Sequence, residues 1–147
     1  MSKPLLIGIS GGTGSGKSRF AKELMKRCAE DSCIYISQDS YYNDLSHMTF
    51  EDRCKINFDS PASIDFIALK NDLNSLIKKI AINLPIYDYT THTRKNKFEN
   101  ILPKDIIIVE GIFSLYDSDI RELLNFKIFV DTPSDIRILR RAKRDIN

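Results

Sequence analysis

The sequence predicts a three-layer α/β fold, in which helices cover both faces of a mainly parallel β-sheet. The first observation is a set of short apolar runs with the length and composition of buried parallel strands. These runs span residues 5–10, 34–37, 106–109 and 126–130. The second observation is that segments with helical spacing of apolar residues lie between the runs or after them, as an alternating strand–helix fold requires.

A glycine-rich segment follows the first predicted strand and is the strongest functional signal in the chain. It matches the phosphate-binding pattern G-x-x-x-x-G-K-[ST] at every fixed position. Its residues are Gly11, Gly12, Thr13, Gly14, Ser15, Gly16, Lys17 and Ser18. A helical pattern begins directly afterwards, so backbone N–H groups and the positive end of a helix would face phosphate. We therefore expect a P-loop NTPase fold that binds ATP with Mg²⁺.

The side chains of this loop and of two later acids suggest how such a site would work. Lys17 would place an ammonium group between the β- and γ-phosphates, and Ser18 would offer a hydroxyl to Mg²⁺. Asp39 follows the second strand and could accept a proton from an attacking hydroxyl. Glu110 follows the third strand, where an acid can orient the metal. An Asp after a strand is more often a turn residue, but the phosphate loop favours the chemical interpretation.

The middle of the chain predicts a helix and a small β-hairpin excursion from the main sheet. Ser60-Pro61 resembles a helix start, and apolar residues keep helical spacing from Phe66 to Ile80. Segments 82–89 and 98–102 then flank a polar stretch, which is typical of two strands joined by a loop.

The last predicted element is a basic helix that opens at Thr132-Pro133-Ser134-Asp135. This segment offers a good N-cap with an acid three residues on. Arg137, Arg141 and Arg144 recur at helical spacing and form one basic stripe. Such a stripe is often only a solvated face, but beyond the fourth strand it would face phosphates, which suit guanidinium groups.

Composition narrows the class of protein further. A length of 147 residues fits a single domain, residues 1–147, that can bury a core of its own. The net charge is +2, with basic residues spread among acidic ones, so no nucleic-acid partner is expected. The three cysteines lack metal-binding spacing and predict reduced thiols in a cytoplasmic protein. No run approaches the roughly twenty apolar residues that span a bilayer, so no membrane partner is expected.

Several further segments resemble the uridine kinase family, whose members phosphorylate the 5′-hydroxyl of uridine or cytidine with ATP. The similar segments are residues 36–42, 57–61, 85–94 and 109–113. Residues 129–132 and the arginines after them resemble the family's approach to its lid. These segments occur in the family's order and cover nearly the whole chain, so together they are more specific than the phosphate loop alone.

The resemblance implies a role for each matching residue. Asp39 would be the general base on the ribose 5′-hydroxyl and, with Ser18 and Glu110, a magnesium neighbour. Asp59 would bind the ribose hydroxyls. The nucleoside pocket would be lined by Tyr42, Tyr87, Tyr89 and His92, and the triphosphate would be contacted by Arg141 and Arg144. Pyrimidine salvage and a homo-oligomer, common in the family, are further implications.

Taken alone, these side chains have simpler interpretations. The alternating Tyr87 and Tyr89 suit strand packing, and a His92 in a polar loop is usually solvated. Asp59 before Ser60-Pro61 could help to cap a helix. The family pattern is what favours the functional interpretation of each.

Two other functions stay open. The first is a kinase of another small hydroxyl metabolite, since phosphoribulokinase, pantothenate kinase and nicotinamide riboside kinase share the loop and a related architecture. The second is a catalytically inactive nucleotide-binding regulatory module. Uridine kinases continue beyond the position of Asn147 with an arginine-rich lid, a strand and a helix. Without them we expect incomplete closure over the phosphates and an exposed sheet edge at residues 126–130.

Overall fold

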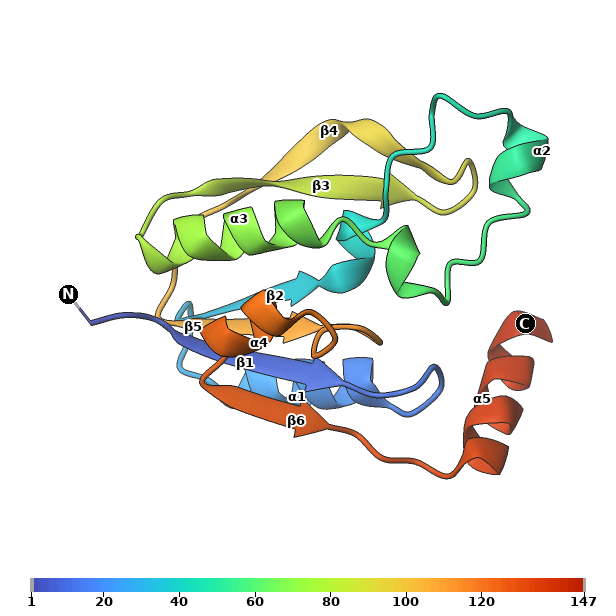
Figure 1. Ribbon diagram of the computed structural model, residues 1–147. Helices are drawn as coiled ribbons and strands as arrows, with labels where there is room; N and C mark the ends of the chain where they lie inside the picture. Colours follow the sequence, from blue (N-terminus) through green and yellow to red (C-terminus); the bar gives the residue numbers. More distant parts are fainter. Residues whose placement is uncertain (1, 147) are drawn as a thin grey trace.

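A computed structural model describes residues 2–146 and confirms the predicted three-layer α/β fold (Figure 1). The central sheet consists of β1 (Leu5–Ser10), β2 (Cys33–Ser37), β5 (Ile106–Glu110) and β6 (Phe126–Phe129). Its order is β2-β5-β1-β6, and every pairing is parallel. The carboxyl ends of all these strands therefore lie at one edge, and β6 is an outer strand of the described sheet, as expected.

Helices cover the two faces of this sheet with separate apolar clusters. Helix α1 (Lys17–Arg27) packs on one face, where Ala21 is buried against β1 and β5. Helices α3 (Phe66–Ile77) and α4 (Ser118–Leu123) lie on the opposite face (Figure 1). Their fully buried residues meet the other side of the strands, and they are Leu69, Leu73, Leu76 and Ile120. Alternating strand residues thus point to two different cores.

The predicted hairpin is confirmed, although its second strand is longer than expected. Strands β3 (Ile82–Asp88) and β4 (Thr93–Ile101) form a separate antiparallel sheet beside α3. The polar stretch before residue 98 was expected to be loop, but most of it belongs to β4. This strand is almost entirely exposed, so it can pair with β3 without an apolar pattern.

The start and end of the central helix also differ from the prediction. Ser60 caps only a short 3₁₀ turn, η2 (Pro61–Ser63). Helix α3 begins at Phe66, and its N-cap is Asp65, whose carboxylate accepts a 3.0 Å hydrogen bond from the Ala68 N–H. The helix ends at Ile77, so Ile80 lies outside it and is 55% exposed. Asp and Ser are both favoured at the N-cap, so the sequence alone does not decide whether the helix begins after Ser60 or after Asp65.

Two short elements and one longer helix complete the chain around the carboxyl edge of the sheet. They are the 3₁₀ turn η1 (Gln38–Tyr41), helix α2 (Phe50–Arg53) and helix α5 (Ser134–Ile146). Figure 1 shows α5 beside the loop between β1 and α1. Among residues 2–146, no helix is long and apolar enough to cross a membrane.

Candidate active site

The glycine-rich loop connects β1 directly to α1, as its sequence predicts. Gly14 and Gly16 have φ angles of 74° and 91°, which side-chain-bearing residues rarely adopt. Gly16 is the N-cap of α1 and supplies no side-chain cap, so the first N–H groups of the helix stay available for a ligand. The Ser15 hydroxyl is also buried without a hydrogen-bond partner among the described residues. This combination suits an anion with several oxygens.

Helix α5 and the segment just before it contact this loop mainly through the backbone carbonyl groups of the loop. The Thr132 hydroxyl donates to the Ser15 carbonyl at 2.8 Å. Arg140 Nη1 lies 3.4 Å from the Gly14 carbonyl oxygen, and the Arg137 guanidinium lies over Gly12. Arg140 was not among the predicted site residues, because the helical spacing placed Arg137, Arg141 and Arg144, but not Arg140, on one basic stripe. The loop carbonyls thus bring a cluster of guanidinium groups next to the expected phosphate position.

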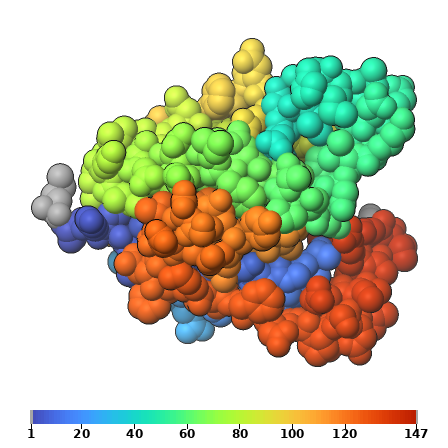
Figure 2. Space-filling model, in the orientation of Figure 1, coloured from blue at the N-terminus to red at the C-terminus, as the bar shows by residue number. Residues whose placement is uncertain are grey.

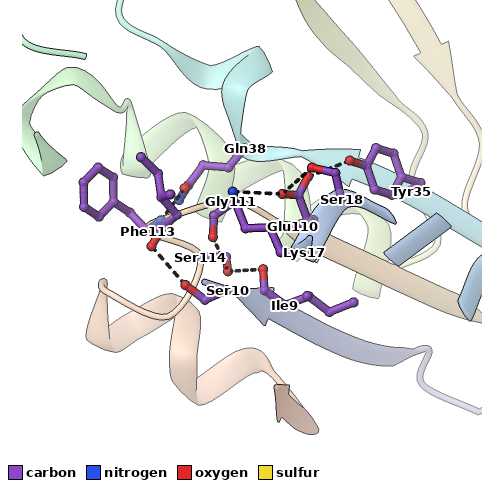
Figure 3. Close-up of polar contacts among 11 residues, drawn as sticks. Ile9, Ser10, Lys17, Ser18, Tyr35, Gln38, Glu110, Gly111, Phe113 and Ser114 are labelled. Atoms are coloured by element: carbon purple, nitrogen blue, oxygen red, sulfur yellow. Dashed lines mark hydrogen bonds and ion pairs between the residues drawn. The ribbon is translucent and has the colours of Figure 1, made fainter. Parts of the chain in front are cut away.

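A buried carboxylate, Glu110, forms the floor of the site at the end of β5 (Figure 3). It is only 4% exposed. Its Oε1 accepts a 3.1 Å hydrogen bond from the Ser18 hydroxyl and lies 4.0 Å from Lys17 Nζ. Its Oε2 accepts a 2.6 Å hydrogen bond from the Tyr35 hydroxyl. The structure therefore brings together Lys17, Ser18 and Glu110, as the sequence predicts.

Hydrogen bonds connect the turn after β5 to the ends of β1 and β2, and they fix the position of the chain next to Glu110. Gln38 Oε1 accepts a 2.9 Å hydrogen bond from the Phe113 N–H. The Ser114 hydroxyl donates to the Ile9 carbonyl at 2.7 Å (Figure 3). A Cβ atom at Gly111 would overlap the Gln38 side chain. Glycine is therefore the residue that lets the two strand ends approach this closely.

Asp39 stands in the 3₁₀ turn that follows β2 and faces the phosphate loop across a cavity. Burial raises the pKa of its carboxyl group above the usual range, and the Glu110 charge adds to this, whereas Lys17 lowers the pKa. A partly desolvated carboxylate next to an ammonium group can act as a proton acceptor.

The cavity between these groups has a volume of about 420 Å³. Figure 2 shows its surroundings, with the blue N-terminal segment visible between the green segment near residue 60 and the red α5. Most of the predicted site residues line it. The lining comprises Thr13, Lys17, Ser18, Asp39, Tyr42, Phe58, Asp59, Tyr89, Glu110, Ile112, Arg141 and Arg144. An apolar recess beside it is lined in part by Gly11 and Gly12.

One wall of the cavity is aromatic, and two predicted residues stand behind it. The ring of Tyr42 contacts the rings of Phe58 and Tyr87, at centroid distances of 5.3 and 5.2 Å. Tyr87 is buried under this wall, and its hydroxyl has no partner among the described residues. His92 stacks on Phe58 at 4.9 Å. Tyr87 and His92 therefore support the residues that line the cavity instead of lining it themselves.

Phe58 is a site residue that the sequence did not predict, although residues 57–61 belong to one of the family-like segments. Its ring lines the cavity and lies against both Tyr42 and His92. A single Phe in an irregular segment carries no periodic signal, and its position between Asn57 and Asp59 was the only indication. The hairpin that carries His92 is fixed by Arg94, whose Nε donates to the Tyr42 carbonyl at 3.0 Å.

The lining of the cavity also contains an ion pair between two predicted site residues. Arg141 Nη1 lies 3.2 Å from Asp59 Oδ2, and both side chains are about half exposed. Arg141 also contacts Asp145 on its own helix at 3.6 Å. This ion pair places a carboxylate and a guanidinium side by side in the lining of the cavity.

The oxygen atoms of this site fit Mg²⁺. No group of three or more His, Cys, Asp or Glu residues suited to a metal occurs within residues 2–146. Mg²⁺, however, is usually held by one or two carboxylates together with water and substrate phosphates. Asp39, Glu110 and the Ser18 hydroxyl supply this kind of donor set around one cavity.

Comparison with known proteins places the chain in a family. Residues 6–147 match the Phosphoribulokinase / Uridine kinase family. A uridine kinase of Clostridium novyi (strain NT) is 53% identical over 146 residues, which cover 99% of this chain and 70% of that protein.

Two solved structures share the fold, each over 99% of this chain. One is a protein provisionally assigned as a fructose transport system kinase, from Silicibacter sp. TM1040, with a TM-score of 0.84, 19% identity and 74% of that chain covered. The other is a possible uridine kinase from Bacillus stearothermophilus, with a TM-score of 0.68, 20% identity and 82% covered. With the family match, the high identity and the site geometry, the chain is a kinase that belongs to the phosphoribulokinase/uridine kinase family.

Proposed function

We propose that this kinase transfers the γ-phosphoryl group of ATP to the 5′-hydroxyl of uridine or cytidine and thereby forms UMP or CMP. The observation that carries the proposal is the position of Asp39 on the same cavity as Lys17, Ser18 and Glu110. A proton acceptor thus faces a phosphate-binding loop across a space of about 420 Å³. The relatives named uridine kinases support the choice of nucleoside.

The residues of the chain would divide the work as follows. The loop N–H groups and Lys17 bind the triphosphate, and Arg141 and Arg144 contact its outer oxygens. Asp39 removes the proton from the 5′-hydroxyl as that oxygen bonds to the γ-phosphorus. The bond between the γ-phosphorus and the β–γ bridging oxygen then breaks, and ADP leaves.

A bound Mg²⁺ would supply positive charge beside the phosphates. Ser18, Asp39 and Glu110 are the residues that would hold it. Two of them already share a hydrogen bond, from the Ser18 hydroxyl to Glu110 Oε1, so their oxygens point into the same region.

The acceptor would lie against the aromatic wall. Asp59 offers two carboxylate oxygens, which suit the vicinal hydroxyls of a ribose. Tyr42 and Tyr89 present rings to the base, and Phe58 adds a third ring face. Behind them lie the imidazole of His92 and the buried hydroxyl of Tyr87, which has no hydrogen-bond partner within residues 2–146. Contact of either group with the polar edge of a pyrimidine would require this wall to rearrange.

We further propose that the kinase acts in pyrimidine salvage in the cytoplasm, with a nucleoside as its small-molecule partner. The homo-oligomer implied by the family resemblance is part of the same proposal.

The choice of acceptor can be tested by competition. We expect uridine and cytidine to be phosphorylated, and pantothenate, ribulose 5-phosphate and nicotinamide riboside to be left unreacted at equal concentration.

Asp59→Asn should raise the KM for uridine by about tenfold or more. The amide is neutral, so the ribose hydroxyls lose their hydrogen bonds to a charged carboxylate. Asp105→Asn is the matched control, since this exposed acid lies at the opposite edge of the sheet.

Product analysis by chromatography distinguishes the outcomes. Preferred phosphorylation of one of the competing metabolites would move the assignment to another kinase of the same family. ATP binding with no phosphorylated product from any acceptor would favour a regulatory module.

A further inference from the structure

Tyr35 stands in the middle of β2, and its phenol reaches a residue that the proposed reaction uses. Its ring packs against the apolar cluster between the sheet and α1. Its hydroxyl donates a 2.6 Å hydrogen bond to Glu110 Oε2 (Figure 3). A donor to an ionised carboxylate at this distance forms a strong, charge-assisted hydrogen bond. Nothing in the phosphate loop or in the resemblance marks this residue.

The register of the sheet explains how the contact arises. Strand β2 pairs with β5 so that Ser37 lies opposite Glu110 and Tyr35 lies opposite Ile108. Tyr35 is therefore the diagonal neighbour of Glu110 on the same face of the sheet, a separation that a long aromatic side chain can span. A shorter side chain at this position would not reach the carboxylate.

The two oxygens of Glu110 have separate partners. Oε1 faces the phosphate loop, where it accepts from Ser18 and lies 4.0 Å from Lys17 Nζ. Oε2 faces the sheet and accepts from Tyr35. The carboxylate is thus held from both sides.

We propose that Tyr35 is a positioning residue that anchors Glu110 through Oε2 and so presents Oε1 to Ser18 and to the metal–phosphate region. The inference rests on the proposed function, since that is where Glu110 is assigned to Mg²⁺. A carboxylate held through one oxygen keeps its orientation, whereas one without this anchor is free to turn toward Lys17. Outer hydrogen-bond partners of this kind orient a metal ligand and raise the affinity of the site.

The test compares two Tyr→Phe variants. Tyr35→Phe removes the hydroxyl and keeps the ring. Tyr41→Phe is the matched control, because the Tyr41 hydroxyl also donates to a carboxylate, Asp72 Oδ2, at 2.8 Å, and the residue is fully buried but does not line the cavity. Both variants lose a phenol–carboxylate hydrogen bond, but only one of these bonds involves a proposed metal ligand.

The primary measurement uses Mn²⁺ in place of Mg²⁺ as a spectroscopic probe. Its affinity is determined in the presence of a non-hydrolysable ATP analogue, from the electron paramagnetic resonance signal of the Mn²⁺ that stays free. We expect Tyr35→Phe to weaken Mn²⁺ binding by about tenfold and Tyr41→Phe to leave it unchanged. The Mg²⁺ concentration for half-maximal UMP formation should rise in parallel for Tyr35→Phe, with the KM for uridine unaltered and kcat recovered at high Mg²⁺.

Unchanged Mn²⁺ affinity in Tyr35→Phe would overturn the inference, as would an equal loss in both variants, which indicates general destabilisation. The Mn²⁺ measurement needs no nucleoside, so it stands apart from the choice of acceptor. Wild-type binding of Mn²⁺ and nucleotide without UMP formation would count against the proposed function alone. Failure of the wild-type chain to bind them at all would overturn both.

Discussion

Replacing Asp39 with Asn is expected to lower kcat for UMP formation by roughly a hundredfold or more, because an amide cannot accept the proton of the 5′-hydroxyl. The substitution keeps the size of the side chain. Within residues 2–146, Asp39 makes no hydrogen bond to the phosphate loop. At saturating Mg²⁺, which offsets the loss of one proposed metal ligand, ATP affinity should therefore stay close to that of the wild type. Single-turnover measurement of UMP with radiolabelled ATP, together with calorimetric titration of ATP, separates the two quantities.

The control for this variant is again Asp105→Asn, which removes a carboxylate whose side chain is 79% exposed and pairs with Lys79 far from the cavity. Full activity of Asp39→Asn would contradict the assignment of Asp39 as the general base. A large loss of ATP affinity with unchanged kcat would also contradict it, because Asp39 would then act in nucleotide binding.

Replacing Lys17 with Ala is expected to weaken ATP binding itself. The Lys17 side chain is only 13% exposed, and its nearest acid is Glu110 Oε1 at 4.0 Å, so its ammonium group is available to a phosphate. Loss of a hydrogen bond between charged groups costs about 1.5–3 kcal/mol, which corresponds to roughly tenfold to a hundredfold in affinity. The measurement is the dissociation constant of ATP with Mg²⁺ by titration calorimetry.

Lys22→Ala provides the comparison, because Lys22 is exposed on the same helix. Lys17→Arg should restore little, since a planar guanidinium does not replace a compact ammonium in a tight loop. Unaltered ATP affinity in Lys17→Ala would mean that the loop does not hold the triphosphate in the expected way.

The sequence alone predicted the parts of the fold that depend on local pattern. Buried parallel strands are continuous apolar runs, so β1, β2 and β5 were located to within a residue or two at their ends. The outer strand β6 was located from the same apolar pattern, although most of its residues are exposed. The strand order depends on long-range pairing, which no local pattern reveals. For the same reason β4, whose residues are polar and exposed, was taken in part for a loop.

The site likewise contains residues that a local pattern predicts and contacts that only the tertiary structure shows. Lys17, Ser18, Asp39 and Glu110 follow strand ends, and parallel topology brings strand ends together, so their meeting could be anticipated. Tyr35 lies inside an apolar run, and its contact with Glu110 depends on the register of two strands. The packing of His92 against Phe58 depends on where the turn of the hairpin lies relative to the segment before η2. Such contacts require the tertiary structure.

The most direct test of the account is formation of UMP by this chain. The purified protein is incubated with Mg²⁺, ATP and uridine, and UMP and ADP are quantified together by chromatography, with a reaction lacking uridine as the control. The account predicts that UMP and ADP appear in equal amounts and only when uridine is present. ADP release that does not depend on uridine, with no UMP formed, would contradict it.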